Sequence, residues 1–498
     1  GSVLINGLTA LLAMTPSTPS KLHTPTVRER ILSGTDDITD LGAPVGLGSR
    51  ATSFYERTQE NSTFRPLTAG GIRQSIFVLV QTSLGGGILT IAYMMRLSGV
   101  LLGTLLLIIT GIVAWVSMDV LMKCAVKQHR YTLGSLMSCV FGQGIGVAMD
   151  LMLFLYGNGS LITYFIFLGD FIPTIFECLS QGTYSEHERD ELRTRCLVGA
   201  LLLVMGASLP RDLSGLRFLS PVMAVGILYT EAIVVWKCVS YNLPSEWSLE
   251  EMEDDFRMKK VELWNLDFFD LLQAFSLCVF SYVCHLNVTP VAKELANPED
   301  RRIEKISFRV VVVQFFIYLI LAVGGYLTFG DKTAPNLLTN YAADDPWILA
   351  SRIGLTFTIL VAVATNTNPT VRACLCLLEE FFPSIKEPTA GLNTQPFLET
   401  PQTPPLIKRN LSEEPQCRRY LRYFLSISCL TMDTTIAICV RDVASVVGFL
   451  GATMGTLMMM VIPGLLVYKM DIFSVTMSRL IILLFVVSAA FNCFAVFH

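Results

Sequence analysis

The sequence predicts an all-α, multi-pass membrane protein. The chain of 498 residues is 52% hydrophobic and only 16% charged, and its mean hydropathy is +0.54. Such an apolar composition is unusual for a soluble protein of this length. The apolar residues are gathered into segments of about 20 residues or more, the length that an α-helix needs to cross the hydrocarbon core. The first segment contains three consecutive glycines, Gly85 to Gly87, which predict a broken helix.

Eleven apolar segments predict about eleven transmembrane helices. Charged or turn-forming loops separate most of them, so each segment is interpreted as one crossing. The third is long and the fourth is short for a single crossing. In chain order, the predicted spans are residues 72–97, 99–124, 144–177, 195–210, 215–239, 266–290, 306–329, 348–378, 420–440, 442–468 and 473–497.

The glycines interrupt the first span. Glycine weakens a helix and lets the backbone unwind, which exposes N–H and C=O groups. At membrane depth such groups are tolerated only where they face protein or a water-filled cavity, as in the substrate sites of secondary transporters. Thr82 and Ser83 add hydroxyls beside Gly85, Gly86 and Gly87. The alternative is a close-packing seam between helices, with both hydroxyls bonded to their own helix.

Polar residues interrupt the sixth span. Ser281, His285 and Asn287, followed by Thr289 and Pro290, lie in an otherwise apolar segment. We therefore expect a second broken helix here, with the first three of these side chains at the substrate site. His285 is also a candidate to titrate near neutral pH and carry a proton. The alternative is a histidine that holds the break by hydrogen bonds.

Lys and Arg in the loops predict the orientation of the spans. Three basic loops, after spans two, six and eight, fall on one side, and the loops after spans three and five are acidic. This pattern places the N-terminus and the loop 380–418 in the cytoplasm. The basic loop residues are Lys123, Lys127, Arg130, Lys293, Arg301, Arg302, Lys305, Lys386, Lys408, Arg409, Arg418 and Arg419.

Two parts of the chain differ in composition. Residues 1–70 mix Pro, Ser, Thr, Gly and charge without periodicity, which predicts a largely disordered cytoplasmic tail with room for a regulatory partner. Residues 71–498 form the predicted transmembrane domain. A net charge of -4 gives no basic field for nucleic acid, and no nucleophile, base and orienting group occur in a plausible arrangement for an enzyme. No cofactor and no certain metal site are expected.

Six strings occur in a characteristic order between residues 70 and 470. They are QTSLGGGILTIAY at 81–93, the stretch from Tyr131 to Asp170, LPRDLSGLR at 209–217, CHLN with ELANP at 284–298, GGYLTFGD at 324–331, and GFLGAT with PGLL at 448–466. Together they resemble the amino acid/auxin permease family of the amino acid/polyamine/organocation superfamily. The resemblance is strongest to its branch of sodium-coupled neutral amino acid transporters.

The resemblance implies a five-plus-five inverted-repeat transporter fold with discontinuous helices one and six. Repeat one would cover about 72–239, repeat two about 266–468, and the helix 473–497 would be an addition. Spans one and six would then clamp the amino and carboxylate groups of an amino acid. The paired breaks at Gly85–Gly87 and at Ser281–Asn287 support this independently of the resemblance.

The coupling ion stays open between sodium and a proton. Gln81 stands where sodium-coupled members carry an asparagine, so the carbonyl is retained on a longer arm. Those members also use a threonine of the eighth span, for which Thr365 is a candidate beside three other threonines. Glu231 and Asp433 are the acids placed deepest in apolar sequence, and ionisable residues there are costly and tend to be functional or paired.

The expected function is secondary active transport of an amino acid by alternating access, with sodium or protons as the co-transported ion. The alternatives are an uncoupled facilitator or exchanger and an amino acid sensor of the same fold. The expected partners are a small-molecule amino acid and the lipid bilayer, without nucleic acid. The membrane would be the plasma membrane or that of an acidic organelle such as a vacuole or lysosome.

Overall fold

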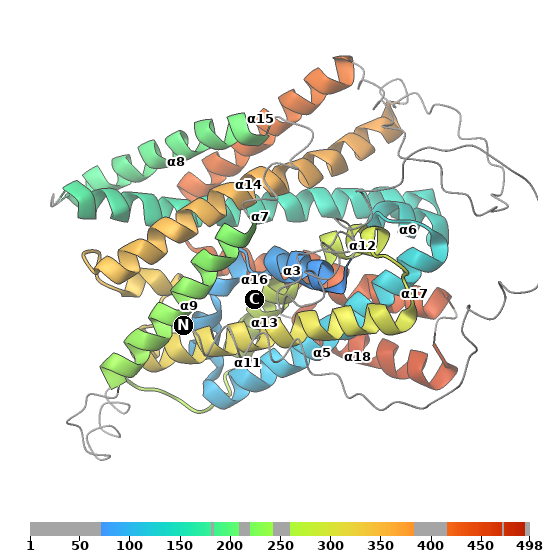
Figure 1. The fold of residues 1–498 in the computed structure, drawn as a ribbon, viewed down its shortest axis with the longest axis horizontal. Helices are drawn as coiled ribbons and strands as arrows, with labels where there is room; N and C mark the ends of the chain where they lie inside the picture. Colours follow the sequence, from blue (N-terminus) through green and yellow to red (C-terminus); the bar gives the residue numbers. More distant parts are fainter. Residues whose placement is uncertain are drawn as a thin grey trace, which may run out of the picture. The chain divides into compact units, whose positions relative to one another are not determined.

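The computed structural model describes residues 71–180, 184–208, 220–242, 259–382, 416–470 and 473–493. All regular secondary structure in these ranges is helical, which confirms the predicted fold class. The predicted N-terminal tail and most of the loop 380–418 lie outside the described residues. Figure 1 shows long helices running side by side, with shorter helical pieces between them.

Eight helical segments of the described chain are long and apolar enough to cross a membrane. They are α5 (Val100–Gln128), α7 (Gln143–Ser180), α9 (Ser220–Asn242), α11 with α12 (Phe268–Tyr282 and His285–Glu294), α13 (Asp300–Phe329), α14 (Pro346–Phe381), the segment Val443–Lys469, and α18 (Val475–Cys493).

The other three predicted spans are also helical but miss this criterion of length and composition. The first is divided into α3 (Ile72–Ser83), the 3-10 turn η2 (Gly86–Leu89) and α4 (Ile91–Ser98), each too short alone. The fourth is α8 (Glu186–Ser208), whose first three turns are highly charged. The ninth is α15 (Gln416–Cys439), which begins with a cluster of arginines. A short helix before α7, α6 (Leu133–Phe141), was not predicted.

Both predicted breaks are present in the structure. They occupy the first and sixth places in the order of the predicted spans. A third irregular segment was not predicted. Between α16 (Val443–Leu450) and α17 (Ile462–Lys469), the tenth span contains two π-helical turns, η7 (Gly451–Gly455) and η8 (Leu457–Val461).

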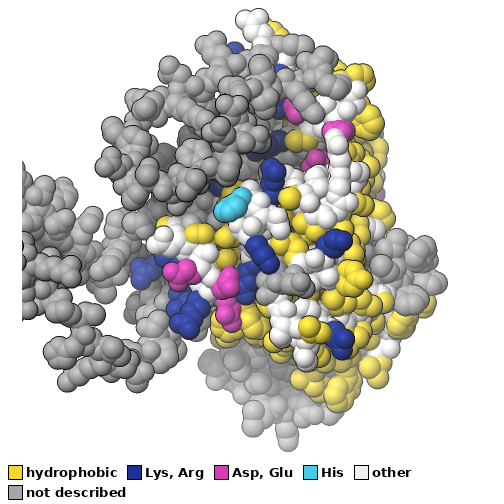
Figure 2. Space-filling view, turned by 90° about the vertical axis from the view of Figure 1, so that its right-hand side faces the viewer, with side chains coloured by type: hydrophobic (Ala, Val, Ile, Leu, Met, Phe, Trp, Pro, Cys, Tyr) yellow, Lys and Arg dark blue, Asp and Glu magenta, His cyan; other side chains and the backbone are white. Residues whose placement is uncertain are grey.

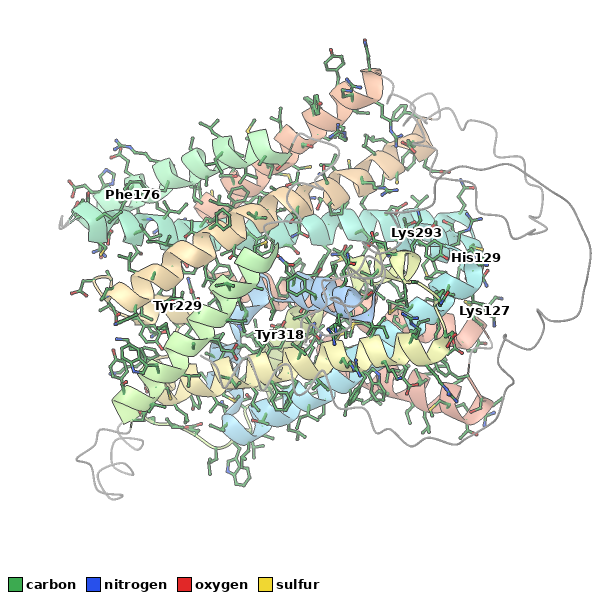
Figure 3. All side chains as sticks on the ribbon, viewed as in Figure 1. Lys127, His129, Phe176, Tyr229, Lys293 and Tyr318 are labelled. Carbon is green, nitrogen blue, oxygen red and sulfur yellow. The ribbon has the colours of Figure 1, made fainter. Side chains whose placement is uncertain are left out.

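The broken helices lie among the long ones. α13 contacts α3, α4, α5 and α9, α11 contacts α4, α5 and α16, and α7 contacts η2, α14 and α15. The largest fully buried side chains include Tyr282 on α11, Tyr318 on α13 and Phe165 and Phe167 on α7. Large buried side chains thus lie on the helices that face the breaks, and Tyr318 lies near the centre of the bundle in Figure 3.

Basic residues of two predicted cytoplasmic loops lie at the same end of the bundle. Lys127 and Lys293 are found together at one end in Figure 3, near His129, while Phe176 and Tyr229 lie toward the other. Figure 2 faces the end that carries the lysines, where Lys and Arg side chains stand among a few acidic ones beside hydrophobic surface. This arrangement agrees with the predicted sidedness of these loops. Which side of the membrane this end faces stays a prediction.

Candidate functional site

The glycines of the first break allow close approach of two other helices. A Cβ on Gly85 would lie 2.3 Å from the hydroxyl oxygen of Tyr164 on α7, and one on Gly87 would lie 2.8 Å from the Cα atom of Ser281 on α11. None of the glycines 85–87 has a positive φ. The break therefore needs glycine for space rather than for an unusual backbone conformation, so the close-packing interpretation and the broken helix are both realised here.

The second break faces the first. α11 ends at Tyr282, Val283 is extended with φ −70° and ψ 106°, and α12 begins at His285. The Ser281 hydroxyl lies 3.3 Å from the carbonyl oxygen of Gly87, and the Asn287 side-chain amide donates to the Thr82 hydroxyl at 3.0 Å. The structure thus joins four of the predicted site residues in two direct contacts between the breaks.

Two residues of α13 connect the same breaks and were missed from sequence. The Tyr318 hydroxyl lies 2.6 Å from the carbonyl oxygen of Ser281 and 3.1 Å from that of Ser83. One turn earlier, the Gln314 side-chain amide donates to the Ser83 hydroxyl at 2.6 Å. The signal was present, because two polar residues four positions apart on one face of an apolar span indicate a buried polar contact.

His285 is fully buried at the start of α12. Its Nε2 atom lies 2.8 Å from the hydroxyl oxygen of Ser117 on α5. Its Nδ1 atom has no hydrogen-bond partner among the described residues. The hydrogen bond to Ser117 fixes the start of α12 against α5. The Nδ1 atom could form one more hydrogen bond at the same position.

The break region presents partial charges of both signs. The first turn of α12 has N–H groups without intrahelical partners, and its dipole favours a negative group there. The last carbonyls of α3 and α11, including those of Ser83 and Ser281, present partial negative charge at the same level. A carboxylate and an ammonium group, a few ångströms apart in one molecule, match this pattern.

The structure does not bring the four coupling-ion candidates together through any hydrogen bond or ion pair between described residues. The Gln81 amide donates to the sulfur of Met223 on α9 at 3.1 Å, and the Thr365 hydroxyl lies 3.0 Å from two carbonyl oxygens of its own helix, α14. Glu231 on α9 is buried, with Oε2 unpartnered among the described residues. Asp433 on α15 is fully buried, with both carboxylate oxygens unpartnered in the same part of the chain.

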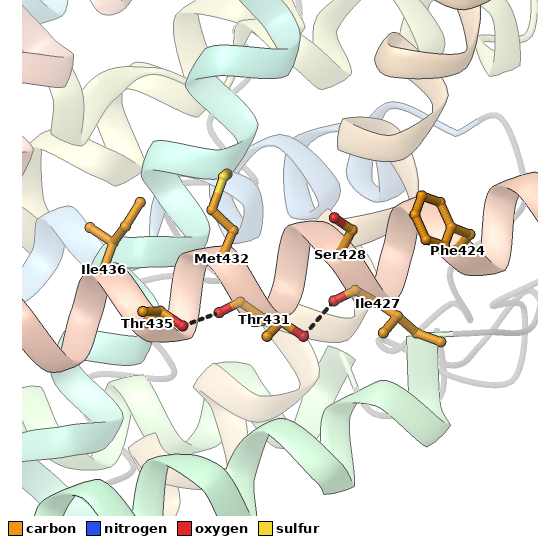
Figure 4. Close-up of a pocket in the computed structure, with 7 residues that line it drawn as sticks. All are labelled: Phe424, Ile427, Ser428, Thr431, Met432, Thr435 and Ile436. Atoms are coloured by element: carbon orange, nitrogen blue, oxygen red, sulfur yellow. Dashed lines mark hydrogen bonds between the residues drawn. The ribbon is translucent and has the colours of Figure 1, made fainter.

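A hollow of about 460 Å³ lies elsewhere, on the outer side of α15. Its lining is apolar apart from three hydroxyls, and those of Thr431 and Thr435 donate to carbonyls of their own helix at 2.7 and 2.8 Å (Figure 4). All of its lining residues belong to α15 and none to the breaks, and its mostly apolar lining suits hydrocarbon better than a zwitterion. The lining residues are Phe424, Ile427, Ser428, Thr431, Met432, Thr435 and Ile436.

A helical bundle whose first and sixth spans are broken, with hydrogen bonds between the two breaks, has the fold of a class of multi-pass membrane transporters. The crystal structure of MhsT in complex with L-phenylalanine has this fold: it matches with a TM-score of 0.56 at 10% identity, over 86% of this chain and 99% of that one. The particular family follows from sequence. A family model described as transmembrane amino acid transporter protein matches residues 68–497, and the chain belongs to that family.

Individual relatives agree with this assignment. The putative amino acid transporter AAT1 of Toxoplasma gondii is 27% identical over 68% of this chain and 45% of its own length. Vacuolar amino acid transporter 6 of Saccharomyces cerevisiae is 23% identical over 80% of this chain and 90% of its own. Human sodium-coupled neutral amino acid transporter 7 is 24% identical over 58% of this chain and 61% of its own. The resemblance seen in the sequence strings is thereby confirmed.

Proposed function

We propose that the protein is a secondary active transporter that moves an α-amino acid across a membrane by alternating access. The observation that carries this proposal is the meeting of two broken helices, joined by Ser281 to Gly87 and by Asn287 to Thr82. Each contact uses a group that an amino acid would also engage. Substrate entry would exchange these contacts for contacts with the ligand, so that binding and opening of the breaks are linked.

The substrate would be held mainly by backbone. Its carboxylate would meet the first turns after the breaks, and its ammonium group would meet the carbonyls that end α3 and α11. Thr82, Ser83, Ser281, His285 and Asn287 would add side-chain contacts. The glycines 85–87 would keep the α7 wall, including Tyr164, close to the substrate.

We propose a proton as the coupling ion. Asp433 and Glu231 are buried acids with unpartnered oxygens among the described residues. An ionised carboxylate is costly in such surroundings. A carboxyl group there would therefore bind a proton when it is buried and release it when it gains access to water. Gln81 contacts Met223 rather than an oxygen-rich site, which weakens it as a sodium ligand. Sodium is the second candidate, because relatives at 24% identity or below carry the name sodium-coupled.

Uptake by purified protein in liposomes tests this proposal. A panel of labelled amino acids would be supplied with a pH gradient or a sodium gradient imposed separately. We expect a pH gradient to drive accumulation, and we expect Asp433→Asn or Glu231→Gln to abolish that accumulation while exchange between internal and external substrate continues. Accumulation driven by sodium would select the second ion. Flux indifferent to both gradients would show a facilitator, and saturable binding without flux would show a sensor.

We also propose that the lysine-bearing end of the bundle faces the cytoplasm, with the N-terminus on that side. Several yeast relatives are named vacuolar transporters, which supports an acidic organelle as one location for this chain. Labelling of a cysteine introduced at His129 in intact organelles or cells tests the orientation. A membrane-impermeant reagent should reach it directly in intact isolated organelles, and only after permeabilisation where the protein lies in the plasma membrane of intact cells.

A further inference from the structure

Asn492 lies near the end of α18, the helix that follows the ten spans of the two repeats. Its side chain is fully buried, although α18 exposes much of its surface. The Asn492 amide nitrogen donates to the Thr456 hydroxyl at 2.5 Å and to the carbonyl oxygen of Gly451 at 3.1 Å. Its amide oxygen accepts from the Ser276 hydroxyl at 2.6 Å. One side chain therefore bonds to the tenth span and to the first half of the sixth.

The contacts on the tenth span fall on its π-helical turns. Gly451 opens η7 and Thr456 separates η7 from η8. A π-helical turn is wider than an α-helical one and departs from the regular bonding pattern, and such turns are frequent at functional sites. The Gly451 carbonyl also accepts from the Thr456 hydroxyl at 3.1 Å. Asn492 thus binds this irregular segment at the carbonyl where side-chain donors converge.

The contact on the sixth span lies about two turns before its break. A Cβ on Gly451 would lie 2.0 Å from the carbonyl oxygen of Ser276, so the two backbones touch at this level. Aromatic packing reinforces the junction, because the Phe491 ring meets the rings of Phe275 and Phe268 edge to face at 5.4 and 6.2 Å. A displacement of α11 would therefore also displace the π-helical turns and α18.

We infer that Asn492 is a positioning residue that ties the π-helical segment of the tenth span to the first half of the broken sixth span. The inference deepens the proposed transport function and rests on it. Asn492 lies outside the breaks and touches neither of them. Its removal should therefore slow the conformational cycle while leaving substrate affinity in place, and it should loosen η7 and η8 whether or not substrate is present.

The test uses the full-length protein with Asn492→Leu, which removes all three hydrogen bonds and keeps the branching of the side-chain heavy atoms. Ser488→Ala, one turn earlier on α18 and also buried, is the matched control. We expect Asn492→Leu to lower Vmax of uptake about tenfold with KM within about twofold, and Ser488→Ala to leave both unchanged. We also expect faster hydrogen exchange of the amides of 451–461 in Asn492→Leu alone. Thr456→Val and Ser276→Ala, which each remove one link, should give smaller changes in the same direction.

Several outcomes overturn the inference. These are wild-type Vmax and exchange rates in Asn492→Leu, a loss confined to KM, or equal effects of Ser488→Ala. If Asn492→Leu does not fold, then unchanged kinetics and exchange in both Thr456→Val and Ser276→Ala also overturn it. Absence of uptake by the wild-type protein contradicts the proposed function instead, and the exchange measurement still decides whether Asn492 holds the π-helical turns.

Discussion

The break region can be compared with the segment 338–343 between α13 and α14, which we call the corner. Both contain polar groups inside the protein, but the hydrogen bonds of these groups are arranged differently. In the corner, Arg352 of α14 donates to four backbone carbonyls of residues 338–343, at 2.9 to 3.3 Å. Its two terminal nitrogens carry four hydrogens, so all four bonds coexist. At the breaks, the Tyr318 hydroxyl has one hydrogen and two carbonyl neighbours, those of Ser83 and Ser281.

The same sharing occurs at Ser281. Its hydroxyl lies 2.8 Å from the carbonyl oxygen of Leu277 and 3.3 Å from that of Gly87, so it donates to only one at a time. A donor with two acceptors within reach can bond to either of them, whereas each of the four Arg352 hydrogens has an acceptor of its own. The corner is therefore suited to hold its shape, and the breaks are suited to exchange partners as the transporter moves.

The largest effect should come from filling the space at the first break. Gly87→Ala places a methyl group against the Cα atom and side chain of Ser281, where the backbone of α11 has no room to yield. Overpacking of this kind costs about 1–3 kcal/mol and displaces the two breaks from each other. We expect uptake to fall to the background of empty liposomes. The measurement is initial uptake rate per amount of folded protein.

Gly199→Ala is the matched control for this change. Gly199 lies on the exposed side of α8, and a Cβ there would meet nothing within 4 Å. Its uptake should equal that of the wild type. Normal uptake by Gly87→Ala would show that the two breaks do not need their close contact, and it would remove the basis for treating them as one site.

A substitution in the corner should lower the stability of the protein rather than its turnover rate. Arg352→Met removes the donor of four carbonyls, of which those of Leu338 and Tyr341 accept in buried bonds. Hydrogen bonds to a charged group are worth about 1.5–3 kcal/mol each before any relaxation. We expect a loss of roughly 3 kcal/mol or more, seen as a lower midpoint of thermal unfolding in detergent. KM of the folded fraction should stay unchanged, because Arg352 does not reach the breaks.

The control for the corner is Arg195→Met. Arg195 is exposed and pairs with Glu191 one turn earlier on α8, at 2.5 Å. Exposed pairs of this kind contribute about 0–1 kcal/mol. If Arg352→Met were no more destabilising than Arg195→Met, the corner would not be the fixed element described above.

The two breaks could be predicted from sequence because they interrupt strongly apolar segments. Glycines in span one and polar residues in span six stand out against such a background. The individual contacts of Asn287 with Thr82 and of Ser281 with Gly87 were not predicted and are seen only in the structure. Tyr318 was not recognised, because a tyrosine in an apolar span was interpreted as packing, and only its spacing of four residues from Gln314 indicates a buried polar contact.

The irregular tenth span and the coupling residues could not be predicted from the sequence, each for its own physical reason. The π-helical turns at 451–461 depend on tertiary partners such as Asn492, which lies about 40 residues away in the chain. Gln81, Thr365, Glu231 and Asp433 were selected by depth and by resemblance, and neither criterion reports which side of a helix a residue occupies. No hydrogen bond or ion pair between described residues joins any two of them, so functional measurement assigns the ion among them.

The smallest of these effects is expected for Tyr318→Phe. It tests whether the Tyr318 hydroxyl changes its hydrogen-bond acceptor during transport or only stabilises the folded structure. Tyr318→Phe removes the shared hydrogen but keeps the ring, which packs edge to face on Tyr282 at 5.2 Å. The carbonyls of Ser83 and Ser281 would lose their common donor, and the breaks would lose one arrangement that the cycle uses. We expect turnover to fall about tenfold, equivalent to about 1.4 kcal/mol, while the thermal midpoint changes by less than in Arg352→Met.

Tyr229→Phe is the comparison that makes this prediction decisive. The Tyr229 hydroxyl donates to a single acceptor, the carbonyl oxygen of Trp347, at 3.3 Å, and it lies toward the opposite end of the bundle from Lys127 (Figure 3). Both substitutions remove one tyrosine hydroxyl, but only the Tyr318 hydroxyl lies between carbonyls of two different helices, α3 and α11. Equal turnover in the two variants would contradict the role given to sharing, whereas a loss specific to Tyr318→Phe would locate the movement at the breaks themselves.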